Sequence, residues 1–224
     1  MDELLRATGI HKHYMLGDAK IEVLRGVDFE VARGEIVAIV GASGVGKSTL
    51  LHILGGLDQP SAGNVALNGV DVFALSDADR AVWRNRQIGF VFQFHHLLRD
   101  FTALENVMMP LMIAGVSPDE ARDPARQLLC AVGLEKRLTH LPSELSGGEA
   151  QRVAVARALV AQPRVVLADE PSGNLDVARS EELHRLIWDL AKSRDQTFVI
   201  VTHDQHLADR ADRVVEMQDG RLVF

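Results

Sequence analysis

Short apolar runs rich in β-branched residues recur along the chain and predict buried strands. They span residues 36–40, 88–92, 165–168, 198–201 and 214–217. Several are continuous and bounded by glycine or charged residues, as expected for strands covered on both faces of a sheet. The stretch 22–31 instead mixes apolar and polar positions and is followed by Arg33-Gly34, which favours a hairpin at a sheet edge. We therefore expect β structure first and an α/β fold after it.

Between about residues 102 and 161 the strand signals stop and helix signals replace them. Three Ser or Thr residues are each followed three positions later by Glu, the capping-box spacing in which a hydroxyl and a carboxylate satisfy backbone N–H groups. The pairs are Thr102 with Glu105, Ser117 with Glu120, and Ser146 with Glu149. The second helix is expected to run to Val132 and to stop at Gly133.

These signals predict one domain over residues 1–224. Its β and α/β core would comprise residues 1–93 and 162–224, and residues 94–161 would form a helical insertion. We interpret this block as an insertion because no linker rich in Pro, Gly or Ser flanks it.

Composition narrows the class of protein. The 224 residues are 47% hydrophobic and 25% charged, as in an ordinary folded globular chain. The 24 Lys and Arg against 31 Asp and Glu give a net charge of −7, which argues against a nucleic acid partner. Cys130, the single cysteine, cannot form an intramolecular disulfide, which fits a reducing cytoplasm. The first residues lack a signal-peptide pattern, and no apolar run reaches the roughly 18 residues of a membrane span.

A glycine-rich motif follows the first predicted buried strand. It reads Gly41-Ala42-Ser43-Gly44-Val45-Gly46-Lys47-Ser48, and a helical stretch is predicted from Thr49 to Leu57. Strand, loop and helix in this order predict a phosphate-binding loop, whose backbone N–H groups and helix start attract phosphate. Lys47 would contact the β and γ phosphates of a bound nucleotide, and Ser48 would offer its hydroxyl to Mg²⁺. The alternative is a glycine-rich turn that binds nothing.

Two further strands end in polar residues. Asp169-Glu170 follows one of them, and we assign Asp169 to Mg²⁺ and Glu170 to activating the attacking water. His203 follows the run 198–201, and it is placed to contact the γ phosphate because ligands bind at the carboxyl ends of such strands. A solvated acidic pair and a structural histidine are the alternatives.

One motif points to a family. Leu145-Ser146-Gly147-Gly148-Glu149-Ala150-Gln151, upstream of Asp169-Glu170, resembles the signature motif of ABC-type ATPases. The resemblance implies a P-loop NTPase (RecA-like) core with an N-terminal antiparallel β subdomain and an inserted α-helical subdomain. It also implies a head-to-tail homodimer that hydrolyses ATP, in which Ser146, Gly147 and Gly148 of one copy close over the γ phosphate bound by the other.

Other positions match the family one by one. Gln93 resembles the glutamine that reaches Mg²⁺ and the water, and Tyr14 resembles the aromatic that stacks on adenine. A packed aromatic in an edge strand is the alternative for Tyr14. The loop 172–176 resembles the place at which two copies touch. The pairs His95-His96 and His11 with His13 are interpreted as surface or partner-facing residues, since neither has further ligands to form a metal site.

Segments 54–58, 92–107 and 170–176 resemble the ATP-binding subunits that power lipoprotein release in Gram-negative bacteria. The resemblance implies an ATPase on the cytoplasmic face of the inner membrane, docked to integral membrane subunits through the segment from Phe94 to Asp100. Macrolide or peptide exporters and division-associated complexes are close alternatives. A soluble ABC ATPase of DNA repair or translation, and an interaction module without turnover, are more distant ones.

Overall fold

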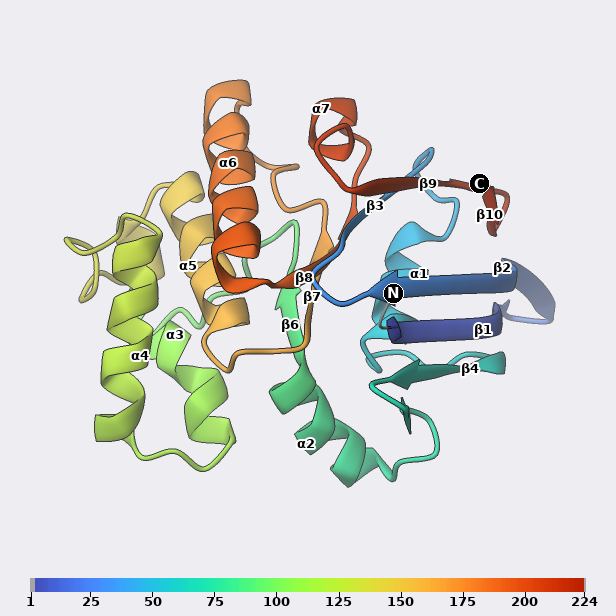
Figure 1. Ribbon diagram of the computed structural model, residues 1–224, viewed down its shortest axis with the longest axis horizontal. Coiled ribbons are helices and arrows are strands. Elements are labelled where there is room, and N and C mark those ends of the chain that lie inside the picture. The colour runs from blue at the N-terminus through green and yellow to red at the C-terminus, as the bar shows by residue number, and fades with distance from the viewer. Residues whose placement is uncertain (1–2, 224) are drawn as a thin grey trace. The chain divides into compact units, whose positions relative to one another are not determined.

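The computed structural model describes residues 3–223, which form two compact units. The first unit comprises residues 3–84 and 195–223, and the second comprises residues 85–194. Figure 1 shows the elements of both. The predicted insertion 94–161 lies inside the second unit, which also contains two strands and a long helix. The proposed bounds of the insertion stay a prediction.

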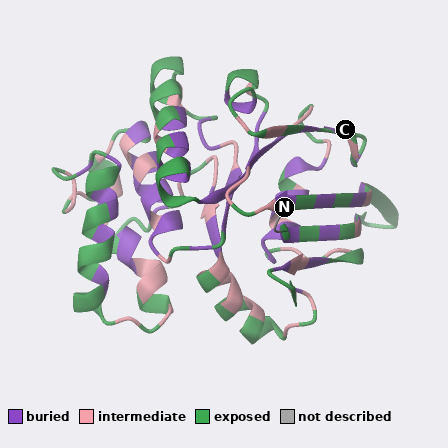
Figure 2. Ribbon diagram, in the orientation of Figure 1, coloured by how far each residue is buried: buried purple, intermediate pink, exposed green. Residues whose placement is uncertain are grey.

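An antiparallel sheet of four strands opens the first unit. The strands are β1 (Glu3–Leu16), β2 (Ala19–Ala32), β4 (Ala62–Leu67) and β5 (Val70–Asp71), in the order β2-β1-β4-β5. The predicted hairpin is therefore confirmed, and it is longer than the 22–31 stretch because β1 pairs with β2 along nearly its whole length. One face is buried, with Leu5, Ile10 and Val27 at 1% exposure or less (Figure 2).

The other strands of the first unit are parallel, except for β10. β3 (Ile36–Val40) lies between β8 (Thr197–Val201) and β9 (Arg213–Gln218) and is parallel to both, and β10 (Arg221–Val223) pairs antiparallel with β9. α1 (Lys47–Leu54) follows β3, and the short α7 (Gln205–Ala208) follows β8. β3 and β8 are buried almost throughout, as their continuous apolar runs predict.

The helix after β3 corrects one expectation. It begins at Lys47 and ends at Leu54, whereas the sequence predicted residues 49–57. It ends early because Gly55 caps it and Gly56 adopts a left-handed backbone conformation with φ of 66°. α2 (Asp77–Gln87) follows β5. The boundary between the two units lies within α2, between Arg84 and Asn85.

The second unit combines two parallel strands with four long helices. The strands are β6 (Ile88–Val91) and β7 (Val165–Asp169). The helices are α3 (Ala103–Ile113), α4 (Pro118–Ala131), α5 (Gly147–Leu159) and α6 (Val177–Arg194), with the 3-10 turn η1 (Pro142–Glu144) before α5. α3 packs against both α4 and α5 (Figure 1). α5 is the most buried of the four, because small apolar residues such as Val153 and Ala156 leave no exposed surface (Figure 2).

The three predicted helix starts are confirmed. Thr102, Ser117 and Ser146 are the N-caps of α3, α4 and α5, and each forms a complete capping box with the Glu three residues later. α4 ends at Ala131 with Val132 as its C-cap, and Gly133 follows with φ of 75°. No helix within residues 3–223 is long and apolar enough to cross a membrane.

Three buried or half-buried side chains hold the irregular segment between β6 and α3. Asn106, which has no exposed surface, accepts from the Leu98 amide and donates to the carbonyls of Leu98, Phe101 and Thr102 at 2.8–3.1 Å. Arg157 of α5 donates to the carbonyls of His95 and His96 at 2.7 and 2.9 Å. Gln151 donates to the carbonyl of Phe92 at 2.8 Å. These bonds fix a segment that lacks regular secondary structure.

Replacing Asn106 with Ala would leave the Leu98 amide and the carbonyls of Leu98, Phe101 and Thr102 without this partner. We expect Asn106→Ala to lower the free energy of unfolding by about 1–3 kcal/mol. Asn85→Ala is the control, since the half-buried Asn85 donates one bond, to the Pro110 carbonyl, and should cost only about 0.5–1.5 kcal/mol. Chemical denaturation of both variants measures the difference. Equal losses would mean that the Asn106 bonds add no particular stability.

Candidate nucleotide-binding site

The loop between β3 and α1 has the backbone shape of a phosphate cradle. Gly41, Gly44 and Gly46 have φ of 149°, 81° and 108°, which L-residues with a side chain rarely adopt. A Cβ at Gly46 would lie 2.9 Å from Leu24 Cδ2 and 3.0 Å from the Val23 carbonyl oxygen. Conformation therefore favours glycine at all three positions, and space requires it at Gly41 and Gly46.

The start of α1 favours an anion. Within the described chain, its N-cap Gly46 supplies no side-chain cap and its first turn contains no acidic residue. The first N–H groups of α1 have no partner inside the helix, and they carry the positive end of the helix dipole. Lys47 is 7% exposed, and its Nζ donates to the carbonyls of Gly41 and Ala42 at 2.7 and 2.9 Å. The loop thus curls around the ammonium group.

His203 lies at the same sheet edge as this loop. β3 and β8 are parallel with Ile39 opposite Val201, so Gly41 and His203 each lie two residues past the paired position. The Thr202 amide donates to the Ile39 carbonyl at 3.1 Å, and this bond continues the pairing to the edge. His203 is exposed there. The structure brings the predicted γ-phosphate contact next to the phosphate loop.

The second unit repeats this arrangement with different side chains. β6 and β7 are parallel with Val91 opposite Ala168, so Gln93 and Glu170 each lie two residues past the paired position. Asp169 is the last residue of β7. Glu170 has φ of 45°, a left-handed conformation that costs of order 1–3 kcal/mol in a residue with a side chain. Such strain is concentrated at functional sites.

Gln93 is linked to the loop 172–176. Its amide Nε2 donates to Asn174 Oδ1 at 3.3 Å, and Asn174 Nδ2 donates to the Gln93 carbonyl at 2.9 Å. In the same loop, the buried hydroxyl of Ser172 lies 2.7 Å from His184 Nε2. Sequence reasoning missed Asn174 and His184 as partners, since nothing in their spacing signals a contact over 81 or 12 residues.

The signature residues stand at the start of α5. Ser146 is the N-cap, and Gly147 and Gly148 form the first turn. The Ser146 amide donates to Glu149 Oε2 at 2.8 Å, and the Glu149 amide donates to Ser146 Oγ at 3.3 Å. Hydrogen bonds from the Ser146 amide, Arg137 and the Ser146 hydroxyl lower the pKa of Glu149 to about 2. The carboxylate is therefore ionised at neutral pH.

Tyr14 stands in a polar cluster on β1. Its hydroxyl donates to Asp58 Oδ2 at 2.7 Å. Lys12 Nζ donates to Asp58 Oδ1 at 2.6 Å and lies 4.7 Å from the Tyr14 ring centroid. Burial and the bond to Asp58 raise the pKa of Tyr14. The side chain is 43% exposed, so it is not a packed core aromatic, and its ring has surface left for a flat ligand.

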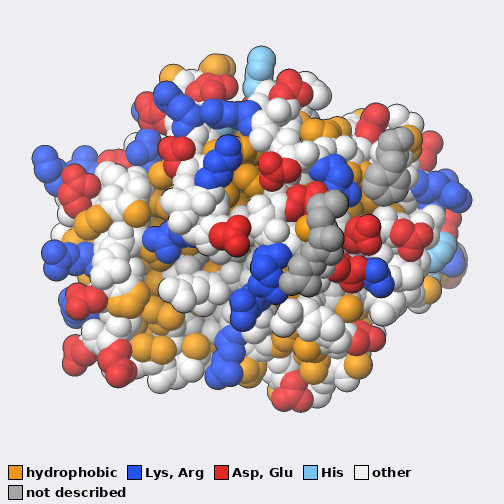
Figure 3. Space-filling model, in the orientation of Figure 1, with side chains coloured by type: hydrophobic (Ala, Val, Ile, Leu, Met, Phe, Trp, Pro, Cys, Tyr) orange, Lys and Arg blue, Asp and Glu red, His pale blue; other side chains and the backbone are white. Residues whose placement is uncertain are grey.

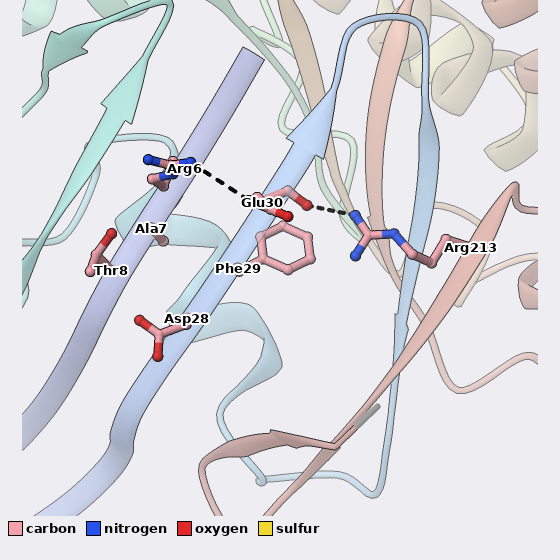
Figure 4. Close-up of a pocket in the computed structure, with 7 residues that line it drawn as sticks. All are labelled: Arg6, Ala7, Thr8, Asp28, Phe29, Glu30 and Arg213. Carbon is pink, nitrogen blue, oxygen red and sulfur yellow. Dashed lines mark hydrogen bonds and ion pairs between the residues drawn. The ribbon is translucent and has the colours of Figure 1, made fainter. Parts of the chain in front are cut away.

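A cavity of about 470 Å³ lies elsewhere in the first unit (Figure 4). It is lined by Arg6, Ala7, Thr8, Asp28, Phe29, Glu30 and Arg213, and no residue of the phosphate loop is among them. Arg213 donates to the Glu30 carbonyl and pairs with Glu35, and Asp28 accepts from the Gly9 amide. The charges of this cavity are thus engaged with the protein itself. On the face in Figure 3, acidic and basic side chains are interspersed.

A buried strand, a glycine loop around a lysine, and an uncapped helix start define a P-loop nucleotide-binding protein. Comparison with known proteins gives the family: the protein-family model described as ABC transporter matches residues 24–173. The chain belongs to the ABC transporter family. The predicted fold and the signature motif are consistent with that membership.

Two curated relatives match over their full length. The lipoprotein-releasing system ATP-binding protein LolD of Geobacter metallireducens is 56% identical, and the alignment covers 100% of this chain and 99% of the relative. The LolD protein of Cytophaga hutchinsonii is 54% identical, with 100% of both chains covered.

Solved structures agree with the fold. The dimeric structure of the ATP-binding cassette MJ0796 in a post-hydrolysis state bound to ADP and Pi has a TM-score of 0.91 and 37% identity. It covers 99% of this chain and 97% of that one. A second dimeric MJ0796 structure has a TM-score of 0.91 at 38% identity, with the same coverage. The predicted class, an α/β ATP-binding cassette with an antiparallel β subdomain, is confirmed, and the chain is an ABC ATPase whose ATP hydrolysis is coupled to transport.

Proposed function

We propose that this chain is the ATP-hydrolysing subunit of a complex that releases lipoproteins from the bacterial inner membrane towards the outer membrane. The observation that carries the proposal is the 54–56% identity, along the whole chain, to two proteins named lipoprotein-releasing system ATP-binding protein LolD. The subunit would lie on the cytoplasmic face of the membrane, bound to integral subunits.

In the proposed reaction, water attacks the γ phosphorus of ATP, the bond to the β–γ bridging oxygen breaks, and ADP and phosphate leave. Glu170 accepts the proton of the attacking water. Lys47 binds the β and γ phosphates, and His203 contacts the γ phosphate. Positioning and charge stabilisation supply most of the acceleration in such reactions. The strained backbone of Glu170 and the position of His203 at the phosphate loop's edge support these roles.

The remaining loop residues bind the nucleotide. Backbone N–H groups would face the phosphates along Gly41, Ala42, Ser43, Gly44, Val45, Gly46, Ser48 and Thr49. Tyr14 would stack on adenine, with Asp58 and Lys12 holding its ring. Ser48, Gln93 and Asp169 supply a hydroxyl, an amide oxygen and a carboxylate, the hard oxygen donors that Mg²⁺ prefers, so the residues fit the ion. Bound there, Mg²⁺ would neutralise charge on the phosphates.

The signature residues would act on a second copy. Ser146, Gly147 and Gly148 would close over the γ phosphate held by the partner, which makes the functional form a head-to-tail homodimer. The start of α5, with two glycines in its first turn, supports this role because backbone N–H groups beside glycine can approach a phosphate closely. The relative MJ0796 is described as dimeric.

The segment from Phe94 to Asp100 would dock the membrane subunits. Phe94 and Leu98 are 64% and 42% exposed, although the backbone around them is held by Asn106 and Arg157. Fixed backbone with exposed apolar side chains is what a docking surface requires, because little ordering entropy remains to be lost on binding.

Removing the proposed base should stop turnover. We expect Glu170→Gln to lower steady-state ATP hydrolysis by the assembled complex roughly 100-fold or more while ATP still binds, since Gln cannot accept the proton. Phosphate release and nucleotide binding measure the two steps. Turnover near the wild-type rate would show that Glu170 is not the base.

Substitutions of Lys47 and of Ser146 should impair different steps, ATP binding and turnover respectively. Lys47→Ala should weaken ATP binding by the isolated chain about tenfold or more, because it removes a charged phosphate contact. Ser146→Ala should leave that binding unchanged and reduce turnover at least about tenfold. Ser117→Ala is the matched control, since it removes the same kind of helix cap from α4. Equal effects of the Lys47 and Ser146 variants on binding would contradict the shared site.

The integral membrane subunits that bind this chain determine which molecule is transported. The intact complex, purified from the native membrane through a tag on this chain, should contain integral subunits that bind acylated lipoproteins and release them when ATP is added. Subunits that bind macrolides, peptides or division proteins instead would overturn the lipoprotein assignment. Phe94→Asp should reduce recovery of the membrane subunits without changing ATP binding by the isolated chain.

A further inference from the structure

The signature helix carries a negative charge close to the place where a phosphate is proposed to bind. Glu149 is the third residue of α5, and its carboxylate is bonded to the amide of Ser146. ATP brings several negative charges to the same helix start. An unneutralised carboxylate there would repel the nucleotide.

Arg137 forms an ion pair with this carboxylate. Its Nε donates to Glu149 Oε1 at 2.8 Å, while Glu149 Oε2 accepts from the Ser146 amide. The two carboxylate oxygens are thus divided between the guanidinium group and the helix cap. Both side chains are partly exposed, 41% for Arg137 and 27% for Glu149, so the pair lies where salt can screen it.

The turn that presents Arg137 is well anchored. The Arg137 amide donates to the Leu134 carbonyl at 2.9 Å, and its carbonyl accepts from the His140 amide at 3.0 Å. The same turn accepts from the first turn of α3, where the Leu104 amide donates to the Leu138 carbonyl at 3.0 Å. These are backbone bonds, so a change of the Arg137 side chain leaves them in place.

We propose that Arg137 is a positioning residue for ATP-driven closure of the dimer: by offsetting the charge of Glu149 it lowers the repulsion between the start of α5 and the γ phosphate of the partner's ATP. This inference rests on the proposed shared site. Arg137 acts through Glu149 and does not touch the nucleotide. Loss of Arg137 therefore harms closure only while Glu149 keeps its charge.

A double-mutant cycle tests the proposal on the full-length chain. Arg137→Met should raise the ATP concentration needed for dimerisation and turnover on the order of tenfold, as expected for one uncompensated charge within about 10 Å. ATP binding to the monomer should not change. In a Glu149→Gln background the same substitution should cost less than about twofold, because Gln preserves the capping box without a charge.

Ionic strength provides an independent measurement. The Arg137→Met defect should shrink between about 50 mM and about 500 mM NaCl, because salt screens the repulsion. Arg137→Lys should retain most of the wild-type response. Arg152→Met is the matched control, since it removes an ion pair of 2.6 Å between α5 and Glu182 without touching the capping box, and should show no salt-dependent defect.

The outcomes separate this inference from the shared site. If Ser146→Ala reduces turnover but Arg137→Met costs the same in both Glu149 backgrounds, the role of Arg137 is structural and the inference fails alone. If Arg137→Met has no effect, the inference also fails. If Ser146→Ala leaves turnover unchanged, the shared site itself is wrong. Circular dichroism of each variant confirms that the helices are intact.

Discussion

Parallel pairing in register is the constraint on which the rest of the site depends. In the first unit, Ile39 opposite Val201 brings the phosphate loop and His203 to one edge. In the second unit, Val91 opposite Ala168 brings Gln93 and Glu170 to one edge. A slip of one residue in either pair would turn every side chain on a strand to the other face and misplace the polar residues that follow it. The buried apolar strands make such a slip costly.

The helix N-termini differ in whether a side chain caps them. α1 begins without a side-chain cap among the described residues, whereas α3, α4 and α5 each begin with a complete capping box. The uncapped start of α1 suits the proposed phosphate contact, because backbone N–H groups that bind phosphate cannot also be covered by a side chain. α5 has two glycines in its first turn beside its capping box, and in the proposed dimer it would also face a phosphate. The charge of Glu149 is the cost of that arrangement, and Arg137 lies where it offsets it.

The polar partners of the site residues show where reasoning from sequence stops. The glycine-rich loop, Asp169-Glu170 and His203 were predicted at the ends of apolar strands, and they lie there: the loop follows β3, Asp169 ends β7, and His203 lies two residues past β8. Asp58 and Lys12 were not predicted as partners of Tyr14, and Asn174 was not predicted as a partner of Gln93. These pairs join residues on different elements, and no local spacing records which side chains will meet. The end of α1 was predicted three residues too late, since apolar residues continue past the glycines that stop the helix.

By itself the sequence determined the positions of the buried strands, three helix caps, the glycine-rich loop and the resemblance to the family. Periodicity, glycine positions and capping pairs are local, so they can be read along the chain. Only the tertiary structure decided the register of the strands, the strained backbone of Glu170 and the pairing of Arg137 with Glu149. Those features arise from packing between segments that are distant in sequence, where burial and the geometry of facing side chains select one arrangement among many.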